Sequence, residues 1–73
     1  MIVMKRVAKR NQKQHIYINE YYFDGGDFLV KTYLLTRKEL EKMEDYVIIH
    51  MDDEKLTAAI CKEDDKEAIE AAL

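Results

Sequence analysis

The sequence lacks several residue types, and each absence limits what the protein can be. Its 73 residues include one cysteine, two glycines, no proline and no tryptophan. The single Cys61 excludes an internal disulfide and a cysteine cluster for zinc, which fits a reducing compartment better than secretion. We therefore expect a cytoplasmic protein. The absence of proline, with 48% hydrophobic and 37% charged residues, is typical of an ordered domain and not of a disordered tail.

Long apolar runs are also absent. None approaches the roughly 20 residues that a membrane helix needs, and residues 1–4 are too short for a signal-peptide core. We therefore expect no membrane association. The length predicts one domain, residues 1–73, near the size at which a single core only marginally offsets chain entropy. Association with another chain would help such a domain.

The two glycines are adjacent, and they predict a β-hairpin over residues 14–36. Gly25 and Gly26 lie between Asp24 and Asp27, and glycine adopts positive φ without a steric penalty. A two-residue loop there fixes the pairing outward from Asp24 opposite Asp27. A loop of three or four residues would shift that register.

Alternation along the two strands distributes large apolar residues to both faces of this hairpin. With a two-residue loop, one face carries Tyr17, Tyr21, Phe23, Phe28, Val30 and Leu34. The other carries Ile16, Ile18, Tyr22, Leu29, Tyr33 and Leu35, interrupted by the opposed charges of Glu20 and Lys31. A hairpin that is apolar on both sides needs cover on both, from its own helices or from a partner.

The rest of the chain predicts one more strand before the hairpin and two strands and two helices after it. Residues 2–7 form a short apolar run, and 36–39 match a capping box that starts a short helix. Residues 46–51 and 56–61 predict a second hairpin across the acidic turn 52–55. An N-cap at 64–65 then predicts a helix with an inward stripe of Ala68, Ile69, Ala72 and Leu73. The expected fold is α+β, in the order βββαββα, with an antiparallel or mixed sheet and both short helices on one face.

Charge is divided unevenly along the sequence. Residues 1–38 contain eight Lys and Arg against three acids, a net of +5, whereas residues 39–73 contain four against twelve, a net of −8. Solvated surfaces explain much of this. A dense charge of one sign also attracts a partner of opposite sign, so the acidic half suits a basic, nucleic-acid-handling protein.

The tyrosines and the acids are the candidate partner-binding residues. Four of the five tyrosines lie in the first hairpin, where the strand preference of tyrosine alone would place them. On an uncovered face they would suit a protein interface, because tyrosine offers a large rigid contact area with a water-tolerant hydroxyl. The predicted contact residues are Tyr17, Tyr21, Tyr22, Tyr33, Glu41, Glu44, Asp45, Asp52, Asp53 and Glu54.

Patterns that indicate catalysis or metal binding are weak. His50 precedes Asp52 and Asp53, but no third clear ligand accompanies them, and Asp24 and Asp27 are ordinary turn residues. Cys61 with either histidine is better explained as a small buried residue than as a nucleophile. We predict no enzyme, no metal and no cofactor.

These features favour a non-enzymatic protein-binding module, such as a small inhibitor or adaptor of the kind encoded by viruses or mobile elements. A standard interface of roughly 800 Å² per partner fits on a chain this short, whereas a deep pocket does not. One alternative is nucleic-acid binding through the sheet tyrosines and the basic residues Lys5, Arg6, Lys9, Arg10 and Lys13. Another is a structural homo-oligomer, for example a homodimer that pairs sheets or edge strands.

Overall fold

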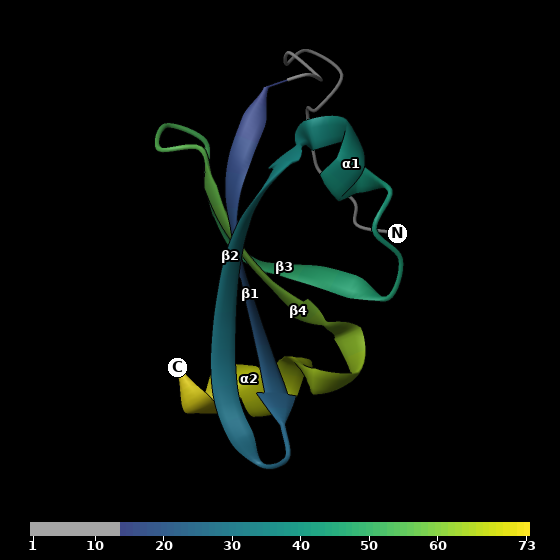
Figure 1. Cartoon of the computed structure of the whole chain (residues 1–73), viewed down its shortest axis with the longest axis vertical. Coiled ribbons are helices and arrows are strands. Elements are labelled where there is room, and N and C mark those ends of the chain that lie inside the picture. Colours follow the sequence, from purple (N-terminus) through teal and green to yellow (C-terminus); the bar gives the residue numbers. More distant parts are fainter. Residues whose placement is uncertain (1–13) are drawn as a thin grey trace.

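A computed structural model describes residues 14–73, which form a single small α+β domain. The elements follow in the order β1 (His15–Asp24), β2 (Asp27–Thr36), α1 (Arg37–Glu41), β3 (Tyr46–Asp52), β4 (Thr57–Lys62) and, after a 3-10 turn, α2 (Lys66–Ala72). Figure 1 shows α1 and α2 at opposite ends of the molecule. The first predicted strand, residues 2–7, lies outside the described residues.

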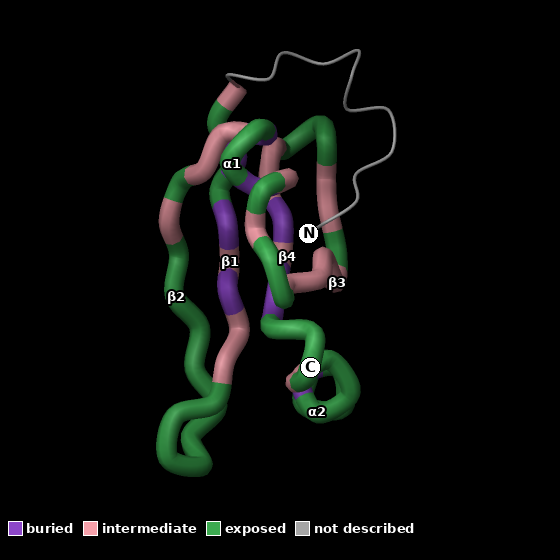
Figure 2. The backbone as a smooth tube through the Cα atoms, turned by 90° about the vertical axis from the view of Figure 1, so that its right-hand side faces the viewer, coloured by how far each residue is buried: buried purple, intermediate pink, exposed green. Residues whose placement is uncertain are grey.

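The four strands form one mixed sheet in the order β2-β1-β4-β3. Both hairpins are antiparallel, and the two are joined through β1 and β4, which run parallel. Figure 2 shows the four strands side by side, with the buried residues on the two central strands. The sequence left the strand order open, because pairing between hairpins depends on contacts between residues far apart along the chain.

The turn of the first hairpin has the predicted geometry and register. Gly25 and Gly26 have φ of 59° and 92°, as a two-residue type I′ turn requires. Asp24 lies opposite Asp27, and the pairing continues without a shift to His15 opposite Thr36. The two predicted faces of the hairpin are therefore the observed ones.

The core lies on the face of β1 that carries Ile16 and Ile18, which we call the core face. It is completed by Ala58 and Ile60 from β4 and by Leu40 from α1. Thr36 starts α1 with the predicted capping box, in which its side chain accepts from the Glu39 amide and Glu39 accepts from the Thr36 amide. The cap therefore fixes where α1, the helix that covers this face, begins.

The two helices do not share a face, which differs from the sequence-based expectation. Cys61 follows Ile60 on β4, so its side chain points away from the core face, yet it is fully buried. The charges that act on its thiol belong to Asp65, Glu70 and Lys66, which places α2 beside it. Of the predicted stripe only Ile69 is buried. The central strand β4 needs cover on both sides, and the helix that follows it supplies the second cover.

Candidate protein-binding face

The face of the first hairpin opposite the core is largely exposed within residues 14–73, although α2 lies on the same side of the sheet, beside Cys61 of β4. We call it the hairpin face, and its apolar members are Tyr17, Tyr21, Phe23, Phe28, Val30 and Leu34. Tyr17, Val30 and Leu34 keep 57%, 51% and 50% of their surface exposed. Large apolar side chains that stay this exposed in a contiguous group are typical of a surface that contacts another molecule.

Aromatic rings gather at the turn end of this face. The rings of Tyr21 and Phe28 stack with centroids 5.8 Å apart, and Phe23 lies 5.5 Å from Phe28 in a tilted arrangement. These diagonal and direct cross-strand contacts follow from the register, since Phe23 is paired with Phe28 and Tyr21 with Val30. The packed rings give this end of the face a fixed shape before any partner binds.

The middle of the hairpin face is polar but uncharged. Thr32 Oγ1 donates to Asn19 Oδ1 at 2.8 Å. The only charged residue between Tyr17 and Phe23 is Glu20, and the only one between Phe28 and Leu34 is Lys31. Side-chain alternation places both on the core face, where they lie opposite each other. The hairpin face therefore offers shape and apolar area without a charge of either sign.

On the core face, the charge of Glu20 is held by two phenols. Its side chain is buried, and Tyr33 donates to Oε1 at 2.7 Å while Tyr46 donates to Oε2 at 3.2 Å. Lys31 Nζ lies 3.9 Å from the same carboxylate. Burial raises the pKa of the Tyr33 and Tyr46 hydroxyls, and the negative charge of Glu20 raises both further. This cluster joins three strands inside the fold.

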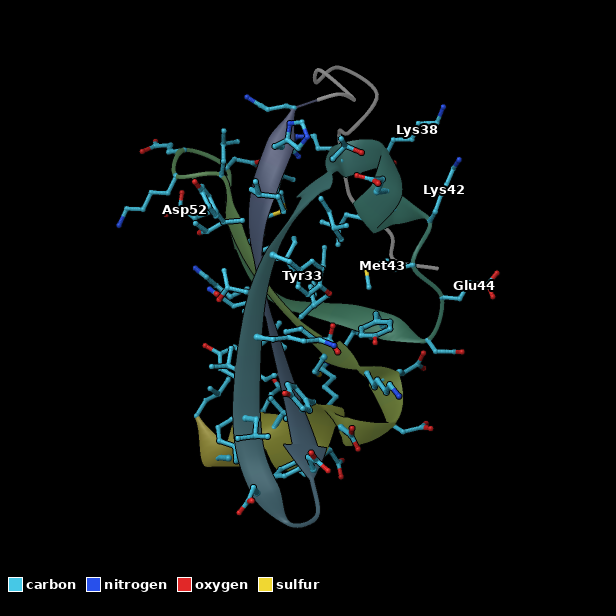
Figure 3. The ribbon with its side chains drawn as sticks, in the orientation of Figure 1. Tyr33, Lys38, Lys42, Met43, Glu44 and Asp52 are labelled. Carbon is cyan, nitrogen blue, oxygen red and sulfur yellow. The ribbon has the colours of Figure 1, made fainter. Side chains whose placement is uncertain are left out.

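The predicted contact tyrosines are therefore divided between the two faces. Tyr17 and Tyr21 lie on the hairpin face, whereas Tyr22 and Tyr33 lie on the core face. Tyr33 points toward the space beside α1, near Met43 (Figure 3). Lys31 lies over the Tyr22 ring, 5.4 Å from its centroid. The structure brings only Tyr17 and Tyr21 together with the exposed apolar residues of the hairpin face.

The predicted acidic contact residues are also divided. Glu41, Glu44 and Asp45 lie at the end of α1 and just after it, whereas Asp52, Asp53 and Glu54 lie in the turn between β3 and β4. Figure 3 shows Glu44 and Asp52 on opposite sides of the molecule. They do not form one acidic surface.

Two residues of the acidic turn have structural contacts. Asp52 Oδ1 accepts from the Glu54 and Lys55 amides, both at 3.0 Å, so it stabilises the turn. Asp53 pairs with the guanidinium of Arg37, which is buried at the start of α1. The pair ties the helix to this turn.

Arg37 and the Glu20 cluster are the buried polar groups that the sequence did not identify. Arg37 is next to the cap of α1, and its backbone amide donates to the Gln14 carbonyl at 3.2 Å. Nothing in the local pattern distinguishes it from the exposed Lys38 beside it. The Glu20–Lys31 pairing was predictable from the register, but the closer contacts to Tyr33 and Tyr46 depend on a third strand.

Residues with catalytic or metal-binding potential remain separate. Cys61 is buried, and burial, with the charges of Asp65 and Glu70, raises the pKa of its thiol, which opposes nucleophilic chemistry. His50 is exposed on β3, opposite Ala59. Within residues 14–73 no three His, Cys, Asp or Glu side chains gather as metal ligands.

The basic residues predicted for nucleic-acid binding, Lys5 to Lys13, lie outside the described residues. All fifteen acids of the chain, but only seven of its twelve Lys and Arg, lie in residues 14–73. No helix in this part of the chain has the length and apolar character to cross a membrane. No family model, curated protein or solved structure matches this chain.

Proposed function

We propose that this chain is a non-enzymatic protein-binding module, an adaptor or inhibitor that contacts another protein through the hairpin face. The observation that carries the proposal is the uncovered group of aromatic and aliphatic side chains around Tyr21 and Val30. Aromatic residues contribute most to binding energy when a partner excludes water from around them. Rings that are already packed lose little conformational freedom on binding.

The excess of acids outside the hairpin face supports a basic partner. Residues 14–73 contain fifteen acids against seven Lys and Arg, and none of the acids lies on the hairpin face between Tyr17 and Phe23 or between Phe28 and Leu34. Acids outside a contact area act mainly by raising the association rate with a basic protein. A nucleic-acid-handling protein has the required charge. The buried, free Cys61 fits a reducing compartment, so the cytoplasm is the proposed location.

A matched pair of substitutions on β2 tests the proposal. Val30→Lys places a charge on the hairpin face, and Leu29→Lys places the same charge one position away, on the opposite face. Both residues are exposed, at 51% and 39%, so both variants should fold. Proteins retained from a lysate of the source organism by the immobilised chain would be compared for the three forms. A specific protein retained by the original chain and Leu29→Lys, but lost with Val30→Lys, is the expected result.

Equal retention by all three forms would exclude the hairpin face as the contact surface. Raised ionic strength gives a separate measurement. If acids outside the contact area attract the partner, the association rate should fall as the salt concentration rises, because salt screens this attraction, while the dissociation rate changes little. A dissociation rate that depends steeply on salt would instead place charged residues inside the contact.

A further inference from the structure

We propose that a second copy of this chain can cover the hairpin face, through a weak two-fold contact between two hairpin faces. This inference rests on the proposed function only in taking the hairpin face to be a protein contact. It names the occupant of that face. Because this contact is weak, a protein that binds the hairpin face more tightly would displace the second copy.

Charge is the first argument for a second copy. The chain carries a net charge of −3, and residues 14–73 carry −8, so two copies repel each other where these acidic residues face one another. The hairpin face contains no charged side chain from Tyr17 to Phe23 or from Phe28 to Leu34. It is a place where two such acidic chains can meet without burying like charges. An identical uncharged face is therefore a match for it.

Symmetry and hydrogen bonding provide the second argument. A two-fold interface requires a surface that is complementary to itself, and an apolar face with one central polar pair meets that requirement. Asn19 accepts from Thr32 through Oδ1, and its amide N–H groups have no partner within residues 14–73. Across a two-fold axis near the middle of the face, they can donate to the Thr32 hydroxyl of the second copy. Central polar pairs of this kind fix the register of an apolar contact.

Area sets the expected strength. The exposed fractions of Tyr17, Phe23, Phe28, Val30 and Leu34 correspond to roughly 400 Å² per copy, if a fully exposed large side chain presents about 150–250 Å². A standard interface buries roughly 800 Å² per partner, so this contact should be weak and reversible. We expect mainly monomer at about 10 µM and a substantial dimer fraction near 1 mM, as for other small interfaces.

Sedimentation equilibrium of the purified full chain from about 10 µM to about 1 mM tests this inference over the range in which small interfaces dissociate. The expected result is a monomer–dimer equilibrium with similar dissociation constants in the original chain and in Leu29→Lys. The dimer should be lost in Val30→Lys, with a dissociation constant raised by at least about tenfold. A monomer at every concentration would overturn the inference. A dimer that persists in Val30→Lys would also overturn it, because the contact would then lie elsewhere.

Amide hydrogen exchange distinguishes the face from the edge of the sheet. β2 is an edge strand within the described residues, and pairing of two β2 edges would protect its outward amides on dimerisation. Packing between hairpin faces leaves those amides exchanging freely and changes side-chain resonances of Tyr17 and Leu34 instead. Protection of the outward amides would overturn the inference. A monomeric chain that still loses a partner on Val30→Lys would leave the proposed function standing alone.

Discussion

The two faces of the first hairpin are made from alternate residues of the same two strands, yet they are covered to very different extents. On the core face, Ile16 and Ile18 are fully buried under Leu40, whereas Tyr17 and Val30 on the hairpin face remain more than half exposed. Both faces are rich in large apolar residues. The difference comes from α1, whose capped start brings Leu40 over one face. A similar apolar content is therefore buried on one face and left exposed on the other.

The largest expected difference between the faces is in the free energy of unfolding. Ile18→Ala should lower it by about 2–5 kcal/mol, because a fully buried isoleucine leaves a cavity under Leu40. Val30→Ala on the hairpin face should change it by less than about 0.5 kcal/mol, as exposed substitutions usually do. Urea denaturation of the two variants measures both values. Equal losses would show that the hairpin face is already covered in the isolated chain.

If Ile18→Ala does not fold, Ile18→Val keeps the comparison measurable. Loss of one buried methyl group typically costs about 0.5–1.5 kcal/mol, which a small domain can tolerate. The loss should still exceed that of Val30→Ala.

The second effect concerns the charge on the core face. Glu20→Ala should destabilise the chain by about 1–3 kcal/mol, because the Tyr33 and Tyr46 hydroxyls lose their common acceptor. Glu20→Gln retains an acceptor oxygen and should cost less. Glu67→Gln, an exposed acid on α2, is the control for loss of a negative charge. Urea denaturation should rank the alanine variant lowest, and stability equal to the control would contradict the role assigned to the cluster.

The same cluster predicts a loss of stability in alkali. The pKa of Tyr33 and Tyr46 is raised above the ordinary value of 10.0 in the folded chain, so the unfolded chain loses these protons first. Their contribution is complete below pH 10 and declines as the pH rises above it. Tyr33→Phe should reduce the decline above pH 10, measured by denaturation at each pH. Tyr17→Phe, which does not contact Glu20, is the control.

Local rules were sufficient for the hairpin and for the start of α1. Gly25 and Gly26 fixed the turn, the turn fixed the register, and alternation then assigned every side chain of the hairpin to a face. The capping pattern at Thr36 located the start of the short helix α1. Each of these features depends on residues close together in the sequence or opposite each other across one turn.

Which face is covered could not be predicted, because the answer depends on long-range contacts. Both faces have an apolar pattern, so periodicity cannot choose between them. The parallel pairing of β1 with β4 joins segments that are far apart in the chain. For the same reason, Tyr33 could be assigned to its strand face but not to its contact with Glu20.

The turn allows the assignment of faces to be tested directly. Gly26→Ala should cost about 1–2 kcal/mol, because φ of 92° is unfavourable for a residue with a Cβ. Its Cβ would have no atom within 4 Å, so the cost is conformational. Gly25→Asn should be nearly neutral, since asparagine is favoured at the first position of this turn. Stability from urea denaturation, with cross-strand contacts between Tyr21 and Val30 measured by NMR, would also detect a shifted register, which would exchange the two faces.

The smallest effect is expected at the cap of the helix that covers the core face. Thr36→Ala should cost about 1 kcal/mol, because the Glu39 amide loses its acceptor at the first turn of α1. Thr32→Ala, on the hairpin face, removes a hydroxyl from an exposed site in the same strand and should cost less than about 0.5 kcal/mol. Thermal and urea denaturation of the pair compare one hydroxyl that positions a covering helix with one that does not. Equal costs would mean that α1 stays over the core face without its cap, and that the packing of Leu40 alone determines which face of the hairpin is covered.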